Sequence, residues 1–275
     1  TIDGFCSGVG TGGTLTGIGE TLKAKNPDIP FYFMPIVTAQ EKYSDKIPDY
    51  LNIDSESEYI SYCFAKLENI KHIDVSKEIC SIDYSFYRTD HHWTTDAAYQ
   101  AYKKASETLG FTPEDEDYFI IETVTDEFKG TLYSKTLNEN IAADSIRVYK
   151  SGSVFTMSVN DKNYGSLYFS DYLGEKDKYS YFLSGNHGIC TVMNHSINEK
   201  KELLIIKDSY ANCLVPFLAE HYSKITLVDP RYCSHSQIKN INPSDYSGVL
   251  VLFNVSGFSQ EQNFALTEFM GGKND

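Results

Sequence analysis

The fold is decided by the stretch ELLIIKDS, residues 202–209 of a 275-residue chain. Its four consecutive branched apolar residues, between polar ends, are typical of a strand that is buried on both faces. A helix is expected directly after it, from about Tyr210 to Tyr222. Further strands are expected at Ile225–Val228 and Val249–Phe253, and a last helix at Phe258–Met270. Strands alternating with helices of this length predict an α/β fold with a central parallel sheet and helices on both faces.

The first half of the chain adds elements of the same kinds. Apolar patterning predicts two strands, at Pro30–Val37 and His72–Val75, and a helix at Ser55–Leu67. Pro35 weakens the first strand, because proline removes a ladder donor. A second helix is predicted at Thr95–Leu109, with Thr94 or Thr95 as its N-cap, Asp96 at the positive end of its dipole and Gly110 as its stop signal.

The middle of the chain, from about residue 117 to 194, has a different character. It is rich in Tyr, Ser, Thr, Gly and Asp, and no helical period is sustained. Short β-like runs are expected at Tyr118–Thr125, Arg147–Tyr149, Val154–Met157 and Leu167–Phe169. We therefore expect one domain over residues 30–275 with a β-rich insertion beside the main sheet, forming one wall of a cleft.

Composition limits the classes of function. Hydrophobic residues make up 41% and charged residues 23%, the usual balance of a soluble globular protein. The net charge of −14 argues against a nucleic-acid partner, which it would repel. No apolar run approaches the length of a membrane span, and the chain has no signal-like start. None of the six cysteines has CxxC spacing, and nothing indicates an oligomeric state.

Residues 88–94, RTDHHWT, are the strongest candidate for chemistry. They hold an Asp, two His and the only Trp of the chain in four consecutive positions. If the segment is extended, Asp90 and His92 face the same way, so the carboxylate could orient the imidazole. His91 would face away. A metal site formed by Asp90, His91 and His92 is the alternative, but adjacent histidines rarely converge on one ion, so no metal is predicted.

Ser209 could be the partner of His92. It stands where a strand ends and a helix begins, which exposes its hydroxyl beside backbone N–H groups that could hold an oxyanion. The alternative is that Ser209 or Asp208 simply caps the helix. Together, Asp90, His92 and Ser209 predict a Ser-His-Asp arrangement for acyl transfer.

Four more residues are candidates for the oxyanion or the substrate. Asn254 could donate from its side chain at the end of a strand, or cap that strand. Arg231 could bind an anionic substrate or pair with Asp229. Trp93 could stack on a sugar or, as we favour, pack behind His92. Tyr210 directly follows the nucleophile candidate.

The N-terminal stretch predicts a separate strand–loop–helix unit. Glycine lets a backbone approach a phosphate, so the loop residues Gly10, Thr11, Gly12, Gly13 and Thr14 could cradle an anion at a helix start. Residues 1–29, TIDGFCSGVGTGGTLTGIGETLKAKNPDI, resemble the phosphate-binding segment of the cysteine synthase family. That resemblance implies pyridoxal phosphate, but the family's lysine lies upstream of this loop and nothing precedes it here. The other interpretation is an orphan unit that binds no cofactor.

The rest of the chain resembles the DHHW family, which is related to SGNH-hydrolase-like enzymes that acetylate alginate. The resemblance lies in RTDHHWTTDAAY, FKGTLYSKT and IIKDSYANCLVPFLAEHYSKITLVDPRY, at residues 88–99, 128–136 and 205–232. It implies a three-layer, flavodoxin-like SGNH fold and a triad of Asp90, His92 and Ser209. One departure is Lys207 before Asp208, where many SGNH hydrolases have glycine, which leaves the Ser209 N–H as the safest oxyanion donor.

The resemblance also implies a function. We expect a serine esterase or O-acetyltransferase that needs no cofactor and acts on a small ester, an acylated carbohydrate or a cell-surface polymer. The acetylating relatives act mostly outside the cytoplasmic membrane, so an extracytoplasmic or cell-surface location in a bacterium is expected. Two alternatives stay open: a pyridoxal-phosphate protein related to cysteine synthase, and a non-catalytic carbohydrate-binding surface protein.

Overall fold

The computed structural model describes residues 22–67, 69–260 and 270 of the chain. The candidate phosphate loop at positions 10–14 lies outside the described residues. The end of the N-terminal unit can be followed: Leu22 is buried in the main core, and Asn26 accepts a hydrogen bond from Ser244 at 2.6 Å. Residues 22–29 therefore pack on the rest of the molecule. No helix in the described part of the chain is long and apolar enough to cross a membrane.

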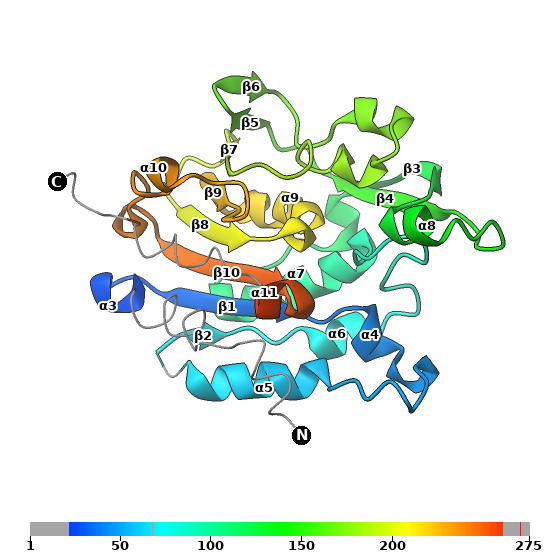
Figure 1. The fold of residues 1–275 in the computed structure, drawn as a ribbon. Coiled ribbons are helices and arrows are strands. Elements are labelled where there is room, and N and C mark those ends of the chain that lie inside the picture. Colours follow the sequence, from blue (N-terminus) through cyan, green and yellow to red (C-terminus); the bar gives the residue numbers. More distant parts are fainter. Residues whose placement is uncertain (1–21, 68, 261–269, 271–275) are drawn as a thin grey trace.

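Eight strands form one sheet in the order β2-β1-β10-β8-β9-β7-β5-β6. The strands from β2 to β9 are parallel, and β7, β5 and β6 continue the sheet in antiparallel pairing. Figure 1 shows β1, β10 and β8 ending at the same edge. The strand bounds are β1 Phe31–Ile36, β2 Lys71–His72, β5 Phe155–Val159, β6 Lys162–Tyr164, β7 Ile189–Asn194, β8 Glu202–Lys207, β9 Lys224–Val228 and β10 Gly248–Asn254.

The α/β fold with a mostly parallel central sheet is thus confirmed, but the β-rich stretch is arranged differently from the expectation. Three of its strands, β5, β6 and β7, extend the main sheet instead of lying beside it. Only β3 (Ile120–Phe128) and β4 (Asp144–Lys150) form a separate antiparallel ribbon. The expected run Leu167–Phe169 is no strand, and Tyr168 makes only an isolated bridge to Phe182.

Pro35 is accommodated inside β1 because of where the neighbouring strand ends. Phe33 accepts a hydrogen bond from Ile73 on the β2 side, and Pro35, two residues on, faces that same side. β2 ends at His72, so no β2 carbonyl lies opposite Pro35, and the N–H that proline lacks leaves no ladder hydrogen bond unmade.

Helices and turns cover the sheet and join its strands. Among them, α7 has the expected bounds: the Thr94 side chain accepts from the Ala97 N–H at 3.3 Å, and Gly110 ends the helix at φ 77°. The α-helices are α3 Lys23–Lys25, α4 Ala39–Lys42, α5 Glu56–Lys66, α6 Ser76–Cys80, α7 Thr95–Leu109, α8 Thr131–Thr136, α9 Val215–Leu218, α10 His235–Ile238 and α11 Val255–Gln260. The 3₁₀ turns are η2 Ser44–Lys46, η3 Glu116–Tyr118, η4 Ser170–Gly174, η5 Lys178–Tyr181, η6 Ser209–Cys213, η7 Ala219–His221 and η8 Pro243–Asp245.

The expectation of one continuous helix from Tyr210 to Tyr222 is wrong. The chain there forms η6, then the short α9, then η7. Pro216 at the start of α9 has no N–H to donate to the turn before it, so a regular α-helix cannot run through this position. The last expected helix begins earlier than expected, at Val255 in α11, and residues 261–269 of it lie outside the described part.

Candidate functional site

The residues around Asp90 form a tight loop, not the extended segment that we expected. Phe86 and Trp93 make an antiparallel bridge, and the Tyr87 N–H donates to His92 O at 3.2 Å. The chain bends between them, and Asp90 Oδ1 accepts the His92 N–H at 3.0 Å. This side chain-to-backbone turn, and not strand alternation, puts the carboxylate beside the imidazole.

Asp144, at the start of β4, anchors this loop from the neighbouring ribbon. Its side chain is fully buried and accepts the N–H groups of Arg88 and Thr89 at 3.0 and 2.8 Å. It also accepts the hydroxyls of Thr89 and Tyr84, and it pairs with Arg88 Nε at 3.2 Å. These contacts fix the backbone directly before Asp90.

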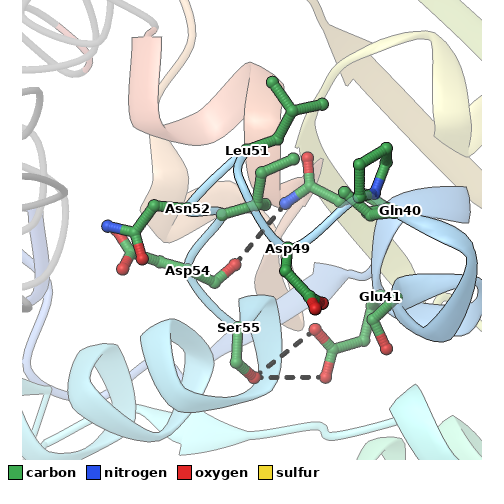
Figure 2. Close-up of a pocket in the computed structure, with 11 residues that line it drawn as sticks. Gln40, Glu41, Asp49, Leu51, Asn52, Asp54 and Ser55 are labelled. Carbon is green, nitrogen blue, oxygen red and sulfur yellow. Dashed lines mark hydrogen bonds between the residues drawn. The ribbon is translucent and has the colours of Figure 1, made fainter.

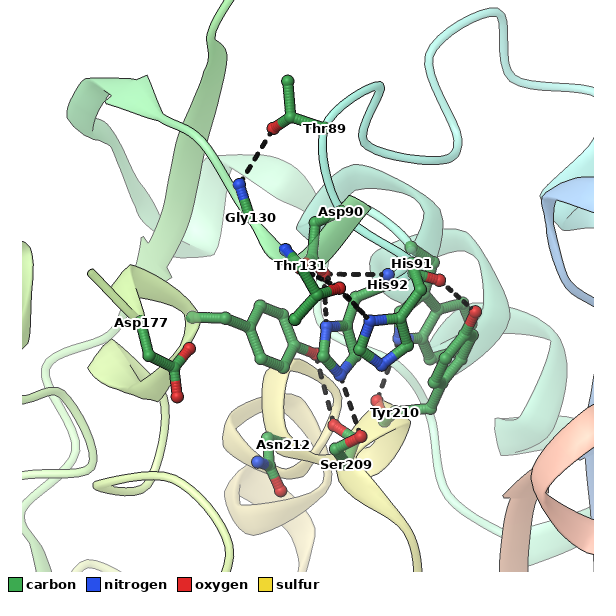
Figure 3. Close-up of polar contacts among 12 residues, drawn as sticks. Thr89, Asp90, His91, His92, Gly130, Thr131, Asp177, Ser209, Tyr210 and Asn212 are labelled. Carbon is green, nitrogen blue, oxygen red and sulfur yellow. Dashed lines mark hydrogen bonds and ion pairs between the residues drawn. The ribbon is translucent and has the colours of Figure 1, made fainter. Parts of the chain in front are cut away.

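Asp90, His92 and Ser209 form a connected row of hydrogen bonds (Figure 3). His92 Nδ1 lies 2.5 Å from Asp90 Oδ1, and His92 Nε2 lies 2.8 Å from Ser209 Oγ. The structure thus brings together the three residues that the sequence singled out. Both imidazole nitrogens are engaged, one by the carboxylate and one by the hydroxyl, which is the geometry of a base held for a serine nucleophile.

The second oxygen of Asp90 is held by the turn at the start of α8. Asp90 Oδ2 accepts the Thr131 N–H at 2.8 Å and the Thr131 hydroxyl at 3.0 Å. Gly130 makes this approach possible, because a Cβ at that position would lie 2.3 Å from Asp90 atoms. Gly130 belongs to the FKGTLYSKT motif, but the motif alone does not indicate this role.

Asp90 is held in its charged form. Burial alone would raise its pKa, but the hydrogen bond from His92, the charges of His92 and His91, and the Thr131 N–H outweigh burial. The pKa of Asp90 is therefore well below its usual range. A carboxylate that stays ionised can stabilise an imidazolium at all ordinary pH values.

Tyr179, in η5, covers one face of the His92 imidazole. The ring centroids of Tyr179 and His92 lie 3.7 Å apart with an interplanar angle of 10°, and the Tyr179 hydroxyl donates to Ser209 O at 3.3 Å. Sequence reasoning missed this residue. It is one of 21 tyrosines, and no spacing relates it to His92 or Ser209.

Asp208 organises the turn that carries Ser209. It accepts the Tyr210 N–H at 2.9 Å, and from Asn254 it accepts the N–H at 2.9 Å and the side-chain amide at 2.6 Å. The side-chain amide of Asn254 is thus bonded to Asp208. Ser209 itself begins η6, and the first N–H groups of a helix have no intrahelical acceptor.

The other expected substrate residues are engaged within the protein. Trp93 is fully buried, donates from Nε1 to Tyr210 O at 2.9 Å and stacks on the Tyr210 ring, so its own ring is not open to a sugar. Tyr210 is also buried, and its hydroxyl donates to His91 O. Arg231 makes two bonds to Asp229, at 2.8 and 2.7 Å, which is the pairing alternative.

Lys207, the departure from the SGNH pattern, is buried beside the turn that carries Ser209. Its Nζ donates to Asn212 Oδ1 at 2.6 Å and to Asn186 Oδ1 at 3.4 Å. Burial lowers the pKa of Lys207, and the nearby Asp229 partly opposes this. The Lys207 side chain ties the loop at Asn186 to the turn that carries Ser209 and Asn212.

The ligand atoms of Asp90, His91 and His92 lie within 4.8 Å of one another, as a metal site would require. Of these, His92 Nδ1 and Asp90 Oδ1 bond to each other, and His91 Nδ1 lies 2.7 Å from the Thr131 hydroxyl. A metal would have to break these contacts, so the donor set fits the hydrogen-bonded arrangement better.

Comparison with known families decides the relationship. A model of the family described as DHHW protein matches residues 17–228. The chain belongs to the DHHW family.

Solved structures share the DHHW fold at low sequence identity. A DHHW family protein from Eubacterium siraeum is 23% identical with a TM-score of 0.79, and the match covers 94% of this chain and 89% of that one. Bacillus cereus PatB1 with a sulfonyl adduct is 18% identical with a TM-score of 0.74, covering 94% and 91%. The O-acetyltransferase domain of Pseudomonas putida AlgJ is 15% identical with a TM-score of 0.51, covering 90% and 82%. These likenesses show the SGNH-like α/β fold of this DHHW protein.

Proposed function

We propose that this protein is a serine esterase or O-acetyltransferase that uses Ser209, His92 and Asp90 as a catalytic triad. The observation that carries the proposal is the continuous row of contacts, 2.5 Å from Asp90 to His92 and 2.8 Å from His92 to Ser209. The fold shared with an O-acetyltransferase domain supports it.

In the proposed reaction, Ser209 Oγ attacks the carbonyl carbon of an ester, and its proton passes to His92 Nε2. His92 then gives this proton to the leaving alcohol as the ester bond breaks, which leaves an acyl group on Ser209. Water or a sugar hydroxyl next attacks the acyl carbon and loses its proton to His92, and His92 passes a proton to Ser209 Oγ as the bond between the acyl group and Ser209 breaks. Asp90 stabilises the imidazolium in both halves, and the Ser209 N–H is the proposed oxyanion donor.

We further propose an acylated carbohydrate or cell-surface polymer as the substrate, encountered outside the cytoplasmic membrane. The O-acetyltransferase domain among the solved neighbours supports transfer of an acyl group, and the carbohydrate follows from the resemblance of the sequence motifs to alginate-acetylating enzymes. No cofactor is required, because every proton and bond in the scheme is handled by side chains of the triad.

The first experiment measures p-nitrophenyl acetate hydrolysis by the parent, Ser209→Ala and His92→Ala. Each variant should lose at least about 10³-fold in kcat, since triad members act as a unit. Labelling with a sulfonyl fluoride and mass spectrometry should place the adduct on Ser209 in the parent. Parental turnover in both variants, or an adduct elsewhere, would show that the triad assignment is wrong. Adding a sugar acceptor and following acyl transfer then separates transferase from hydrolase.

A further inference from the structure

The described residues form a pocket of about 350 Å³ between the ends of β4 and β5 and the turn η4. Its volume is at the small end of the range for ligand pockets, about 300–1,000 Å³. The rings of Tyr168, Tyr181 and Phe155 and the hydroxyls of four serines line it. None of the roles proposed above uses this pocket.

A second pocket of about 320 Å³ lies between α4 and α5 (Figure 2). It is lined by the continuous segment 40–55, including the carboxylates of Glu41, Asp49 and Asp54. Glu41 already accepts the Glu56 N–H at 2.8 Å. An acidic lining alone identifies no ligand, so the inference concerns the aromatic and serine-lined pocket.

That pocket is joined to the catalytic imidazole by a row of packed rings. The Tyr179 ring lies on His92 at 3.7 Å, Phe182 lies 5.4 Å from Tyr179, and Tyr181 lies 5.8 Å from Phe182 between ring centroids. Tyr181 then stacks on Tyr168 at 5.5 Å and lines the pocket. The segment from Tyr179 to Phe182 therefore contacts His92 at one end and the pocket at the other.

Backbone bonds hold the pocket wall to this segment. The Phe169 N–H donates to Tyr181 O at 2.8 Å, and the Leu183 N–H donates to Leu167 O at 2.9 Å. The Tyr168 hydroxyl donates to Tyr149 O at 2.8 Å, which fixes the ring. The wall is thus preformed, as expected of a binding site.

The chemistry of the lining selects the ligand. The hydroxyls of Ser153 and Ser166 already donate, to Glu220 at 2.6 Å and to Tyr168 O at 2.9 Å, so toward a ligand they offer acceptor lone pairs. Tyr181 is buried and stacks on Tyr168, so the aromatic surface open to a ligand comes from the half-buried rings of Phe155 and Tyr168. Among the described lining residues only Lys150 is charged, and its Nζ pairs with Glu122 at 2.6 Å. A neutral, polyhydroxylated ligand with an apolar ring face fits this combination, and an anion does not.

We infer that this pocket is a subsite for a neutral oligosaccharide, which holds one unit of a polymer while Ser209 acts on an ester elsewhere along it. That Ser209 acts on the bound polymer rests on the proposed function. That the pocket binds a neutral oligosaccharide rests on the pocket alone.

The test is calorimetric binding of neutral tetrasaccharides of glucose and of N-acetylglucosamine to the Ser209→Ala protein, with a galacturonic acid tetrasaccharide as the anionic comparison. Gly165→Phe should block the pocket, because Gly165 lines it and an added Cβ there meets no atom within 4 Å. Gly152→Phe is the matched control, since a Cβ at Gly152 also meets nothing and Gly152 does not line the pocket.

At least one neutral tetrasaccharide should bind, and Gly165→Phe should weaken it at least about tenfold while Gly152→Phe stays within about twofold. Ser170→Phe, a second pocket position, should repeat the loss if Gly165→Phe does not fold. The subsite is overturned if neither neutral sugar binds, if the anionic one binds more tightly, or if the pocket variants bind like the control. Binding is measured without turnover, so a negative esterase assay would overturn the proposed function without changing the result of the binding test.

Discussion

Tyr179 lies against the imidazole of His92, the group that becomes positively charged in the proposed reaction. Its ring is 3.7 Å from the imidazole and nearly parallel to it. A cation over an aromatic face in a desolvated site gains about 1–2 kcal/mol. The ring should therefore stabilise the imidazolium more than the neutral base, in the transition state of the proposed reaction.

Tyr179→Leu should lower kcat/KM for p-nitrophenyl acetate about tenfold, the equivalent of about 1.4 kcal/mol. Tyr179→Phe keeps the ring and should keep kcat/KM within about twofold of the parent. Parental kcat/KM in Tyr179→Leu would reduce Tyr179 to a packing role.

Single residues also show where sequence reasoning reached its limit. Asp90, His92 and Ser209 could be selected because the first two stand in a dense local cluster and the third stands where a buried strand ends. Tyr179 and Gly130 could not, because their roles depend on contacts across many intervening residues. No local pattern distinguishes Gly130, where a Cβ would lie 2.3 Å from Asp90 atoms, from any other turn glycine.

The loop from Tyr84 to Thr94 owes its shape to one buried carboxylate on another element. Asp144→Asn removes the charge that five donors share and sets an amide N–H against the donors of Thr89. Breaking such a buried network costs about 3–5 kcal/mol. We expect the free energy of unfolding to fall by about that amount. Esterase activity should fall further than the loss of stability explains, because Asp144 holds Arg88 and Thr89, the two residues directly before Asp90.

Arg88→Gln is the matched control for this prediction. The Arg88 side chain is 54% exposed, so its ion pair with Asp144 contributes about 0–1 kcal/mol. Urea denaturation of both variants measures the difference. Equal losses in Asp144→Asn and Arg88→Gln would show that the buried acceptor does not hold the loop.

Elements with strong local signals were predicted well, and those that depend on context were not. α7 carries its own cap and stop residues, and its bounds agree with the sequence. The stretch after Ser209 has apolar residues at helical spacing, but Pro216 interrupts its hydrogen bonds. β7 was not predicted. Its residues alternate in burial only because the strand pairs with β9 on one side and β5 on the other.

At the scale of the whole molecule, the β-rich stretch continues the sheet instead of forming a separate lobe. Short strands with alternating burial are compatible with either arrangement, and only pairing with β9 decides between them. This continuity has a functional consequence, because it fixes the segment that carries Tyr179 to the same sheet as Ser209.

Burial of histidines across the fold predicts a pH-dependent stability. Burial and the charge of Lys201 lower the pKa of His221 to about 4, while an unfolded histidine titrates near 6.5. Between these values the unfolded chain binds the proton and the native protein does not, so this contribution to the free energy of unfolding falls as pH falls from about 6.5 to 4. Burial also lowers the pKa of His91 and His187, with the same sign. Burial raises the pKa of Glu56, which acts in the opposite direction.

Because these contributions overlap, the test compares slopes. His221→Gln keeps a polar side chain beside the Tyr102 hydroxyl, which lies 2.7 Å from His221 Nε2, but removes the titration. The loss of unfolding free energy between pH 7 and pH 5 should be about 1 kcal/mol smaller in the variant, after discounting for partial solvent exposure. Between pH 9 and 8 His221 is almost wholly neutral in both states, so the unfolding free energies of parent and variant should change with pH by the same amount there. Equal slopes between pH 7 and 5 would mean that His221 takes up its proton as readily in the fold as in the unfolded chain.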